Sequence, residues 1–190
     1  MYLTAALISQ VTASPLAESS GDSENLFETS QDLGELNLES LALYIRSVAV
    51  QLRNRQLCDF FSLCDGSMSS LQMYNMQLPQ LTQGDRCYRR SFRKKTCLTK
   101  IVKSLHEYKN YLQFVKQGTE DEKHQVDSML MSMKNLVDLL QTKIHQQHEE
   151  VLIPDMLSKG VWNKQVKIHV ILRNFALFME SAIRAIRFIK

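Results

Sequence analysis

Four cysteines are the residues whose type and spacing most clearly indicate covalent chemistry in this chain. Cys58 and Cys64 lie six positions apart, and Cys87 and Cys97 lie ten positions apart. Four cysteines allow three disulfide pairings. Nearest-neighbour pairing would close loops of about 7 and 11 residues, and each bond would stabilise the fold by roughly 2–3 kcal/mol. Because zinc sites favour two to four residues between cysteines, we expect disulfides rather than a metal site or buried free thiols.

The remaining reactive side chains form no recognisable catalytic pattern. His145 and His148 lie three positions apart and precede Glu149 and Glu150, so one helix could present both imidazoles to a metal. The chain lacks both His-Glu-x-x-His and Glu-x-x-His, the spacings that hold metals on helices. It also lacks a Gly-rich phosphate loop and a Gly-x-Ser-x-Gly turn. The simpler interpretation of the histidine pair is a solvated polar helix end, and we expect no enzyme, cofactor or metal.

The uneven distribution of charge predicts an acidic partner. The net charge is only +3, but all 23 Lys and Arg residues lie at or after Arg46, whereas seven of the 20 acidic residues precede it. A basic surface suits a receptor face, a sulfated glycan or a nucleic acid. The most basic run extends from Arg86 to Lys95 and contains two aromatic residues, Tyr88 and Phe92.

Four amphipathic segments must position these residues. Apolar side chains recur every three or four positions over residues 37–57, 96–116, 119–144 and 161–190, which predicts four helices packed in a bundle. Asn37 is the expected N-cap of the first helix. Thr119 and Glu122 form the ends of a capping-box sequence that would begin the third. With only 6 Gly and 3 Pro in the chain, the predicted fold class is all-α.

The lengths of the connections predict the topology. Gln117 and Gly118 leave so short a turn between the second and third helices that these two must be antiparallel. About 38 residues separate the first and second helices, enough to return along the bundle, so these two can be parallel. A further crossover surrounds Pro154. The prediction is an up-up-down-down, long-chain four-helix bundle with long crossover loops.

The N-terminal sequence predicts secretion. Residues 1–13 resemble a short signal peptide that lacks its start, because an apolar run precedes small residues and no positive charge comes before it. Residues 14–36 are rich in Ser, Glu and Asp, and we expect a flexible acidic leader there. Residues 37–190 then form the helical domain. No stretch of about 18 apolar residues is present, so no insertion into a membrane is expected.

Cysteine spacing and several short segments together resemble the interleukin-6 family of cytokines over about residues 36–190. The matching features are the 22 residues between Cys64 and Cys87, and the segments Leu78-Pro79, Thr96-Cys97-Leu98-Thr99-Lys100-Ile101, Ile153-Pro154-Asp155, Ile171-Leu172-Arg173-Asn174-Phe175, Phe178-Met179 and Ile183-Arg184-Ala185-Ile186-Arg187. The resemblance implies a secreted cytokine, which we expect to come from a non-mammalian vertebrate. It would bind an alpha receptor, recruit a shared signal-transducing receptor chain and trigger immune and inflammatory signalling of the acute-phase type.

The resemblance also implies which residues bind the receptors. The alpha-receptor surface would combine the second disulfide loop with the last helix: Tyr88, Phe92, Arg173, Glu180, Ser181, Arg184 and Arg187. The signal-transducer surfaces would use the first and third helices, and the start of the last helix with the long loop: Tyr44, Val48, Ser132, Asn135, Trp162 and Leu71. Independently of the family, exposed arginines and aromatic residues are the favoured anchors of protein interfaces.

Each of these assignments has a structural alternative. The arginine stripe could be a solvated helix face, Tyr88 and Phe92 could pack under their loop, and Trp162 could belong to the core. The basic run from Arg86 to Lys95 departs from the family pattern and raises a second function, an extracellular helical protein that binds heparin-like glycans. It also resembles a nuclear-localisation patch, but disulfides and a secretory leader would serve no purpose in a nuclear protein, so binding to nucleic acid is not expected.

Overall fold

The computed structural model describes residues 29–64, 76–145 and 160–189, and within these ranges four long helices bury the apolar stripes predicted from the sequence. The helices are α1 (Thr29–Phe61), α2 (Lys94–Gly118), α3 (Lys123–Ile144) and α4 (Val161–Ile186). Two short 3-10 turns precede α2, namely η2 (Gln83–Asp85) and η3 (Arg89–Ser91). The largest fully buried side chains include Tyr108 of α2, Met129 of α3 and Phe175 of α4, so the core lies between the helices.

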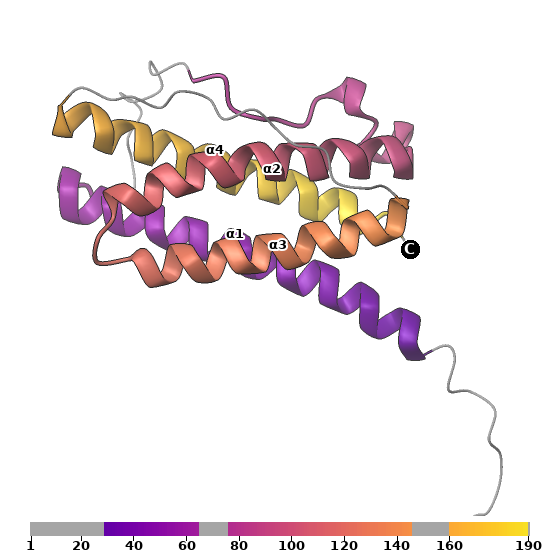
Figure 1. Cartoon of the computed structure of the whole chain (residues 1–190). Helices are drawn as coiled ribbons and strands as arrows, with labels where there is room; N and C mark the ends of the chain where they lie inside the picture. The colour runs from indigo at the N-terminus through magenta and orange to yellow at the C-terminus, as the bar shows by residue number, and fades with distance from the viewer. Residues whose placement is uncertain (1–28, 65–75, 146–159, 190) are drawn as a thin grey trace, which may run out of the picture.

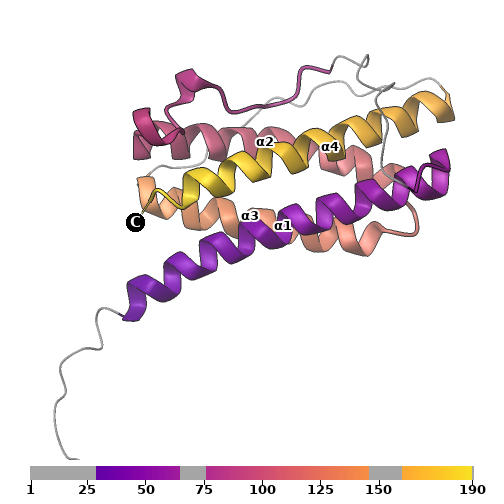
Figure 2. The ribbon, with the colours of Figure 1, turned by 180° about the vertical axis from the view of Figure 1, so that it is seen from behind.

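The first two helices run in one direction and the last two run in the opposite direction. In Figure 1, α1 and α2 run from right to left, whereas α3 and α4 run from left to right. Helices α1 and α2 each pack against both α3 and α4, so α1 and α2 lie across a diagonal of the bundle and every main contact joins antiparallel helices. The view from behind shows α1 and α4 side by side (Figure 2). The predicted up-up-down-down bundle is confirmed.

Helix α1 begins earlier than predicted. It starts at Thr29 rather than near residue 37, so Asn37 lies inside the helix and is not its N-cap. Residues 29–36 therefore belong to α1 and not to the expected flexible leader. This segment contains no proline, and adding residues to an existing helix costs far less than nucleating one. The rest of the predicted leader and the predicted signal peptide lie outside the described residues.

The predicted capping box at the start of α3 is wrong. Helix α3 begins only at Lys123, and its N-cap residue Glu122 makes no side-chain capping bond. The Thr119 hydroxyl instead donates to the carbonyl of Val115 at 2.9 Å, a backward bond to the preceding turn that threonine commonly makes. Thr119 therefore completes α2. A capping box forms elsewhere, at Thr82 and Asp85 of η2.

Two disulfides fix the ends of the long α1–α2 connection. Cys58 bonds to Cys64 just after α1, and Cys87 bonds to Cys97 in the first turns of α2. This is the nearest-neighbour pairing, and the prediction of disulfides is confirmed. No free cysteine is present in the described part of the chain.

The second half of the long connection is fastened to α2. The Tyr108 hydroxyl donates to the carbonyl of Pro79 at 2.9 Å, and Leu78 is only 7% exposed. The Tyr111 hydroxyl donates to the carbonyl of Gln77 at 3.4 Å. These contacts hold residues 77–79 along α2 and so determine where the following segment, with its basic and aromatic side chains, is presented. Among the described helices, none is both long and apolar enough to cross a membrane.

Candidate functional site

A hollow lies between the second disulfide loop and the C-terminal end of α4. Its volume is about 420 Å³, and its walls come from segments almost a hundred residues apart in the chain. The lining residues are Leu81, Cys87, Tyr88, Arg89, Ser181, Arg184, Arg187 and Phe188. The structure therefore brings together Tyr88, Ser181, Arg184 and Arg187, four residues that the sequence predicted to share one surface. We call this the loop–α4 hollow.

The two aromatic residues of the disulfide loop have different positions. Tyr88 is 45% exposed, and its hydroxyl donates to the carbonyl of Leu81 at 3.0 Å. Phe92 is half-buried, and its ring centroid lies 5.7 Å from that of Phe188 beyond the end of α4. Tyr88 is thus available to a partner, whereas Phe92 packs under the loop and fastens it to α4.

The arginines at the end of α4 differ in how firmly they are held. Arg187 Nε lies 2.7 Å from Glu39 Oε1 of α1, whereas Arg184 Nη1 lies 3.3 Å from Glu180 Oε1 one turn before it. The side chain of Arg184 is 61% exposed. Its other terminal nitrogen donates to the Ser181 hydroxyl at 3.4 Å. Arg184 is consequently the more accessible of these two arginines, and Arg187 also ties α4 to α1.

Ion pairs between α1 and α4 set the register of these helices. Glu39 pairs with Arg187, and Arg46 Nη2 pairs with Glu180 Oε2 at 3.4 Å. These two ion pairs are seven residues apart on each helix. A further seven residues along each helix place Arg53 opposite Arg173. We call these three pairs the α1–α4 charge ladder. Its third pair joins like charges, and Arg173 lies on this ladder rather than in the loop–α4 hollow.

Arg53 has an unusual environment on this ladder. Its Nε and Nη2 donate to the side-chain oxygen of its neighbour Asn54 at 3.1 and 2.8 Å. Burial, followed by the charges of Arg173 and Arg46, lowers the pKa of Arg53 below its ordinary value. The third pair therefore carries an excess of positive charge.

His169 is a functional candidate that the sequence did not indicate. It lies one turn before Arg173, is 3% exposed, and its Nδ1 makes no hydrogen bond within the described residues. Burial, with smaller effects from Arg53 and Arg173, lowers the pKa of His169 to about 4. The sequence places His169 between Ile168 and Val170 in a mostly apolar segment, which gave no signal of its charged neighbour Arg53 on α1.

An aromatic cluster occupies the other end of α4. Trp162 is 58% exposed, so the alternative that it belongs to the core is wrong. Its ring lies 5.2 Å from that of Phe61 and 6.0 Å from that of Phe60. The cluster adjoins the Cys58–Cys64 disulfide at the end of α1. Leu71, which was predicted to share this surface, lies outside the described residues.

Three of the residues predicted to form a receptor surface on α1 and α3 are at least partly exposed. Tyr44 is 45% exposed, Asn135 is exposed and Ser132 is half-buried. Arg55 Nη1 lies 3.7 Å from Glu122 Oε1. Tyr44 lies eleven residues before Arg55 on α1, and position 133 lies eleven residues after Glu122 on α3. Because the two helices are antiparallel, Tyr44 lies level with the segment that holds Ser132 and Asn135.

Val48 does not belong to that surface. It is 7% exposed and part of the hydrophobic core. Its position three residues after Ile45 and four before Leu52 places it on the buried stripe of α1. The prediction that the Val48 side chain lies on a receptor-binding surface is therefore wrong.

The cationic side chains before and within the first turn of α2 are presented to solvent. Six exposed cations gather there, and none forms an ion pair within the described part of the chain. They are Arg86, Arg89, Arg90, Arg93, Lys94 and Lys95.

No metal site is found among the described residues, since no group of three His, Cys, Asp or Glu side chains could hold an ion. Of the histidine-and-glutamate sequence considered above, only His145 is described. It ends α3 in a left-handed conformation.

Comparison with known proteins gives a consistent set of relatives. The family described as Interleukin-6/G-CSF/MGF matches residues 14–189. The chain is 33% identical to interleukin-6 of Gallus gallus, over 97% of this chain and 81% of that protein. It is 34% identical to interleukin-6 of Vulpes vulpes, over 93% of this chain and 88% of that protein.

A solved structure shares the fold. The chain resembles one from a crystal structure of a cytokine/receptor complex with a TM-score of 0.59, at 20% identity. The match covers 84% of this chain and 98% of the other. At this identity the likeness establishes the arrangement of helices and nothing finer.

Proposed function

This chain belongs to the Interleukin-6/G-CSF/MGF family, a family of cytokines rather than enzymes, and on that premise we propose that it is secreted and assembles receptors. It binds an alpha receptor and then recruits a shared signal-transducing receptor chain, which triggers immune and inflammatory signalling. The protein performs no chemistry in this proposal. Its role is to hold several binding surfaces at fixed positions on a rigid bundle, so that receptor chains come together.

The loop–α4 hollow is the observation that carries the proposal. It joins an exposed aromatic ring, Tyr88, with an accessible arginine, Arg184, around a concave apolar floor. Tyrosine and arginine are enriched among the residues that dominate binding energy, particularly where a pocket excludes water. We assign the alpha receptor to this hollow.

The aromatic cluster supports a second receptor contact at a distance from the first. Phe60, Phe61 and Trp162 surround the start of α4, and the hollow surrounds its end. A helix of 26 residues is about 39 Å long, so two receptor chains can occupy both ends together. Tyr44 and Asn135, on α1 and α3, offer a third surface for the signal-transducing chain.

Replacing the arginines of the hollow tests the first contact. We expect Arg184→Ala with Arg187→Ala to weaken binding to the alpha-receptor ectodomain by about 2 kcal/mol, roughly thirtyfold, as measured by surface plasmon resonance. Glu39→Gln is the matched control, because it breaks the ion pair of Arg187 with α1 and keeps both arginines. Full affinity in the folded double variant would refute the assignment of this hollow.

Replacing the exposed tryptophan tests the second contact. Trp162→Ala should leave alpha-receptor affinity and melting temperature almost unchanged, because its side chain is mostly solvent-exposed, while recruitment of the signal-transducing chain is lost. The measurement is a ternary-complex pull-down alongside a receptor-phosphorylation assay. Undiminished signalling by a variant that binds the alpha receptor normally would contradict the role of the aromatic cluster.

A sulfated glycan is the second candidate partner, favoured by the six exposed cations between Arg86 and Lys95 that lack ion-pair partners in the described chain. Heparin chromatography provides the test. Arg90→Gln with Arg93→Gln should elute at lower salt than the wild type, whereas Lys103→Gln with Lys143→Gln, which removes the same charge elsewhere, should elute at higher salt than the loop variant. Identical elution of the two variants would show only a general attraction of charge.

A further inference from the structure

A second concave site lies between α2 and α3, beside the proposed α1–α3 receptor surface, because Asn135 lies one turn after Met131 on α3. Its volume is about 420 Å³, within the range of small-molecule pockets. The lining residues are Leu105, His106, Lys109, Asp127, Leu130, Met131, Met133, Lys134, Val137 and Asp138. We call it the α2–α3 groove.

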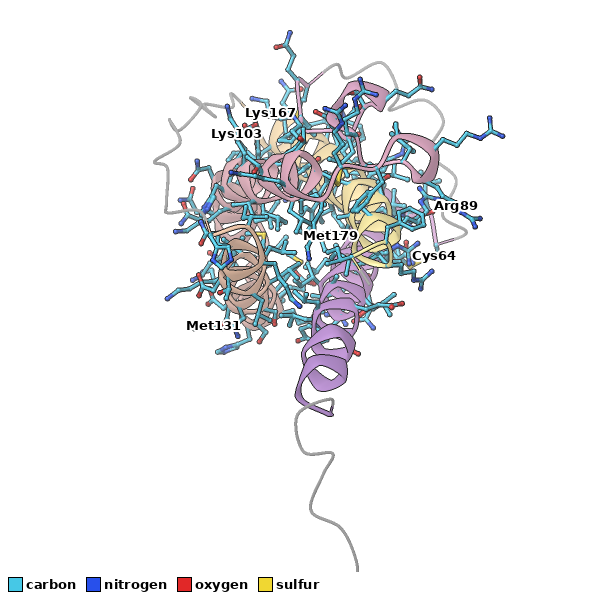
Figure 3. All side chains as sticks on the ribbon, turned by 90° about the vertical axis from the view of Figure 1, so that its right-hand side faces the viewer. Cys64, Arg89, Lys103, Met131, Lys167 and Met179 are labelled. Atoms are coloured by element: carbon cyan, nitrogen blue, oxygen red, sulfur yellow. A yellow bond between two sulfur atoms is a disulfide. The ribbon has the colours of Figure 1, made fainter. Side chains whose placement is uncertain are left out.

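The floor of the groove is apolar. Leu105, Met133 and Val137 are 0%, 3% and 5% exposed, and they belong to the hydrophobic core. Met131 forms a wall and is 62% exposed, although its side chain is apolar. Figure 3 shows Met131 projecting from the outer side of α3, whereas Met179 lies inside the bundle. A flexible, exposed methionine beside an apolar floor can adapt its shape to a bound apolar chain.

Two lysines face each other across this floor. Lys116 Nζ lies 2.6 Å from Asp127 Oδ1, which joins α2 to α3 at one end of the groove. Lys109 lies seven residues before Lys116 on α2, and Lys134 lies seven residues after Asp127 on α3. Because the two helices are antiparallel, the two lysines lie at the same level. Neither forms an ion pair within the described residues, and both are exposed. Their long apolar stems can lie along the walls while both ammonium groups meet above the floor.

We propose that the α2–α3 groove binds a single-chain amphipathic anion, whose apolar chain lies on the floor and whose anionic head group lies between Lys109 and Lys134. Two unpaired cations at the same level provide charge complementarity for one carboxylate or phosphate, which would also relieve their mutual repulsion. Asp127 does not oppose the anion, because it is already paired with Lys116. The remaining acidic residue, Asp138, lies one turn beyond Lys134.

The two lysines that lack ion-pair partners in the described chain and the length of the groove favour a lipid-like anion as its occupant. The groove spans the twelve residues from Asp127 to Asp138, about 16 Å along α3. That length suits one extended chain. The inference goes beyond receptor assembly, because it assigns a small amphipathic ligand to the groove between α2 and α3.

Calorimetric titration with decanoate, decyl phosphate and decanol, each below its micelle concentration, tests the proposal. We expect the two anions to bind the wild type at least tenfold more tightly than Lys109→Gln with Lys134→Gln, and decanol to bind both proteins equally. The control is Lys103→Gln with Lys143→Gln, which removes two charges from the same helices outside the groove. Tighter binding of decyl phosphate than of decanoate would identify phosphate as the natural head group.

Methyl NMR of Leu105 and Val137 locates the ligand, and circular dichroism verifies that each variant is folded. Shifts of these methyls on adding decanoate support the groove as the site. Equal binding of decanoate to both lysine variants, or shifts confined to other methyls, would overturn the proposal. So would an acidic amphipathic peptide that occupies the groove while decanoate does not bind.

Discussion

At the scale of single residues, His169 shows how much chemistry depends on neighbours from another helix. Its ring is buried against Phe61, and its charged form is opposed by burial, Arg53 and Arg173. The folded protein therefore holds His169 neutral at physiological pH. Of the three causes, only Arg173 is close to His169 in the sequence. Arg53 lies on α1, and the burial depends on how the helices pack, so the sequence around His169 does not indicate this environment.

The depressed pKa of His169 predicts acid sensitivity. The pKa falls from 6.5 in the unfolded chain to about 4 in the folded protein, so below pH 6.5 the unfolded chain binds a proton that the folded protein does not. This group should remove roughly 3 kcal/mol of stability as the pH falls from 6.5 to 4, and nothing above 6.5. Urea denaturation across this range measures the effect.

The matched variants are His169→Gln, which cannot be protonated, and His124→Gln, which changes an exposed histidine. The first should lose the decline in stability between pH 6.5 and 4, and the second should keep it. A decline of equal size in His169→Gln would assign the acid sensitivity to other groups.

Residue positions were predictable where pattern and burial agree. The cysteines were predicted because their spacing alone limits the chemistry. Val48 was misassigned to the surface although it lies on the same apolar stripe as Ile45 and Leu52, and its burial follows from that stripe. Trp162 could not be placed from the sequence, because an amphipathic helix start suits both a core residue and an exposed anchor.

At the scale of helices, Gly118 makes the junction of α2 and α4 possible. A side chain at this position would meet Ile168, which is fully buried, and Lys164. Gly118→Ala would normally favour a helix by about 1 kcal/mol. Here we expect it to destabilise the protein by about 1–3 kcal/mol, because the extra carbon overpacks the interface.

Chemical denaturation measures this effect, with Gly84→Ala as the control. A side-chain carbon at Gly84 meets only the Thr82 hydroxyl oxygen at an ordinary 3.7 Å, so this variant should change stability little. If Gly118→Ala were at least as stable as the wild type, the close approach of α2 and α4 at this point would be disproved.

The third pair of the α1–α4 charge ladder is open to improvement. Arg173→Glu would replace a like-charge pair by an ion pair with Arg53, in the same register as the two pairs already present. We expect about 0.5–1 kcal/mol of added stability, which is typical of partly exposed pairs, and a melting temperature higher by about 2–4 °C.

Arg173→Gln separates the two contributions, because it removes the repulsion without adding an attraction. Thermal unfolding should rank Arg173→Glu above Arg173→Gln, and both above the wild type. If the glutamate variant were no more stable than the glutamine variant, Arg53 would not face position 173 as the ladder register requires.

The four helices were predictable, but some of their ends were not. Apolar periodicity identifies a buried stripe over many residues, so the four segments and the start of α4 at Val161 agree with the sequence. The start of α3 was misplaced because the Thr119 hydroxyl turns back to Val115. Local sequence offers Thr119 both a forward cap and this backward bond, and packing decides between them.

At the scale of the whole molecule, loop lengths indicated chain directions for the helices that the structure confirms. A short turn forces α2 and α3 to be antiparallel, and a long connection allows α1 and α2 to be parallel. The register between α1 and α4 was not predictable, because it depends on how two distant helices slide past each other. That register brings Arg173 to Arg53 and separates it from the hollow, so the composition of the proposed receptor surfaces required the structure.

The connections also determine the sequence separation of the helix contacts. Helices α2 and α3 are joined by residues 119–122, whereas α1 and α4, the pair with the most extensive contact, stand at opposite ends of the described chain. Bringing distant segments together costs more loop entropy and slows folding. We therefore expect the α2–α3 hairpin to form first and α1 and α4 to dock on it late.

Pulse-labelled hydrogen exchange during refolding, with both disulfides intact, should show amides of α2 and α3 protected before those of α1 and α4. Earlier protection of α1 and α4 would reverse this order. Contacts formed late mainly control the rate of unfolding. We therefore expect the charge ladder to affect the unfolding rate of the protein more than its folding rate. The strength of the ladder then determines how long a single folded molecule keeps the two ends of α4 at a fixed distance.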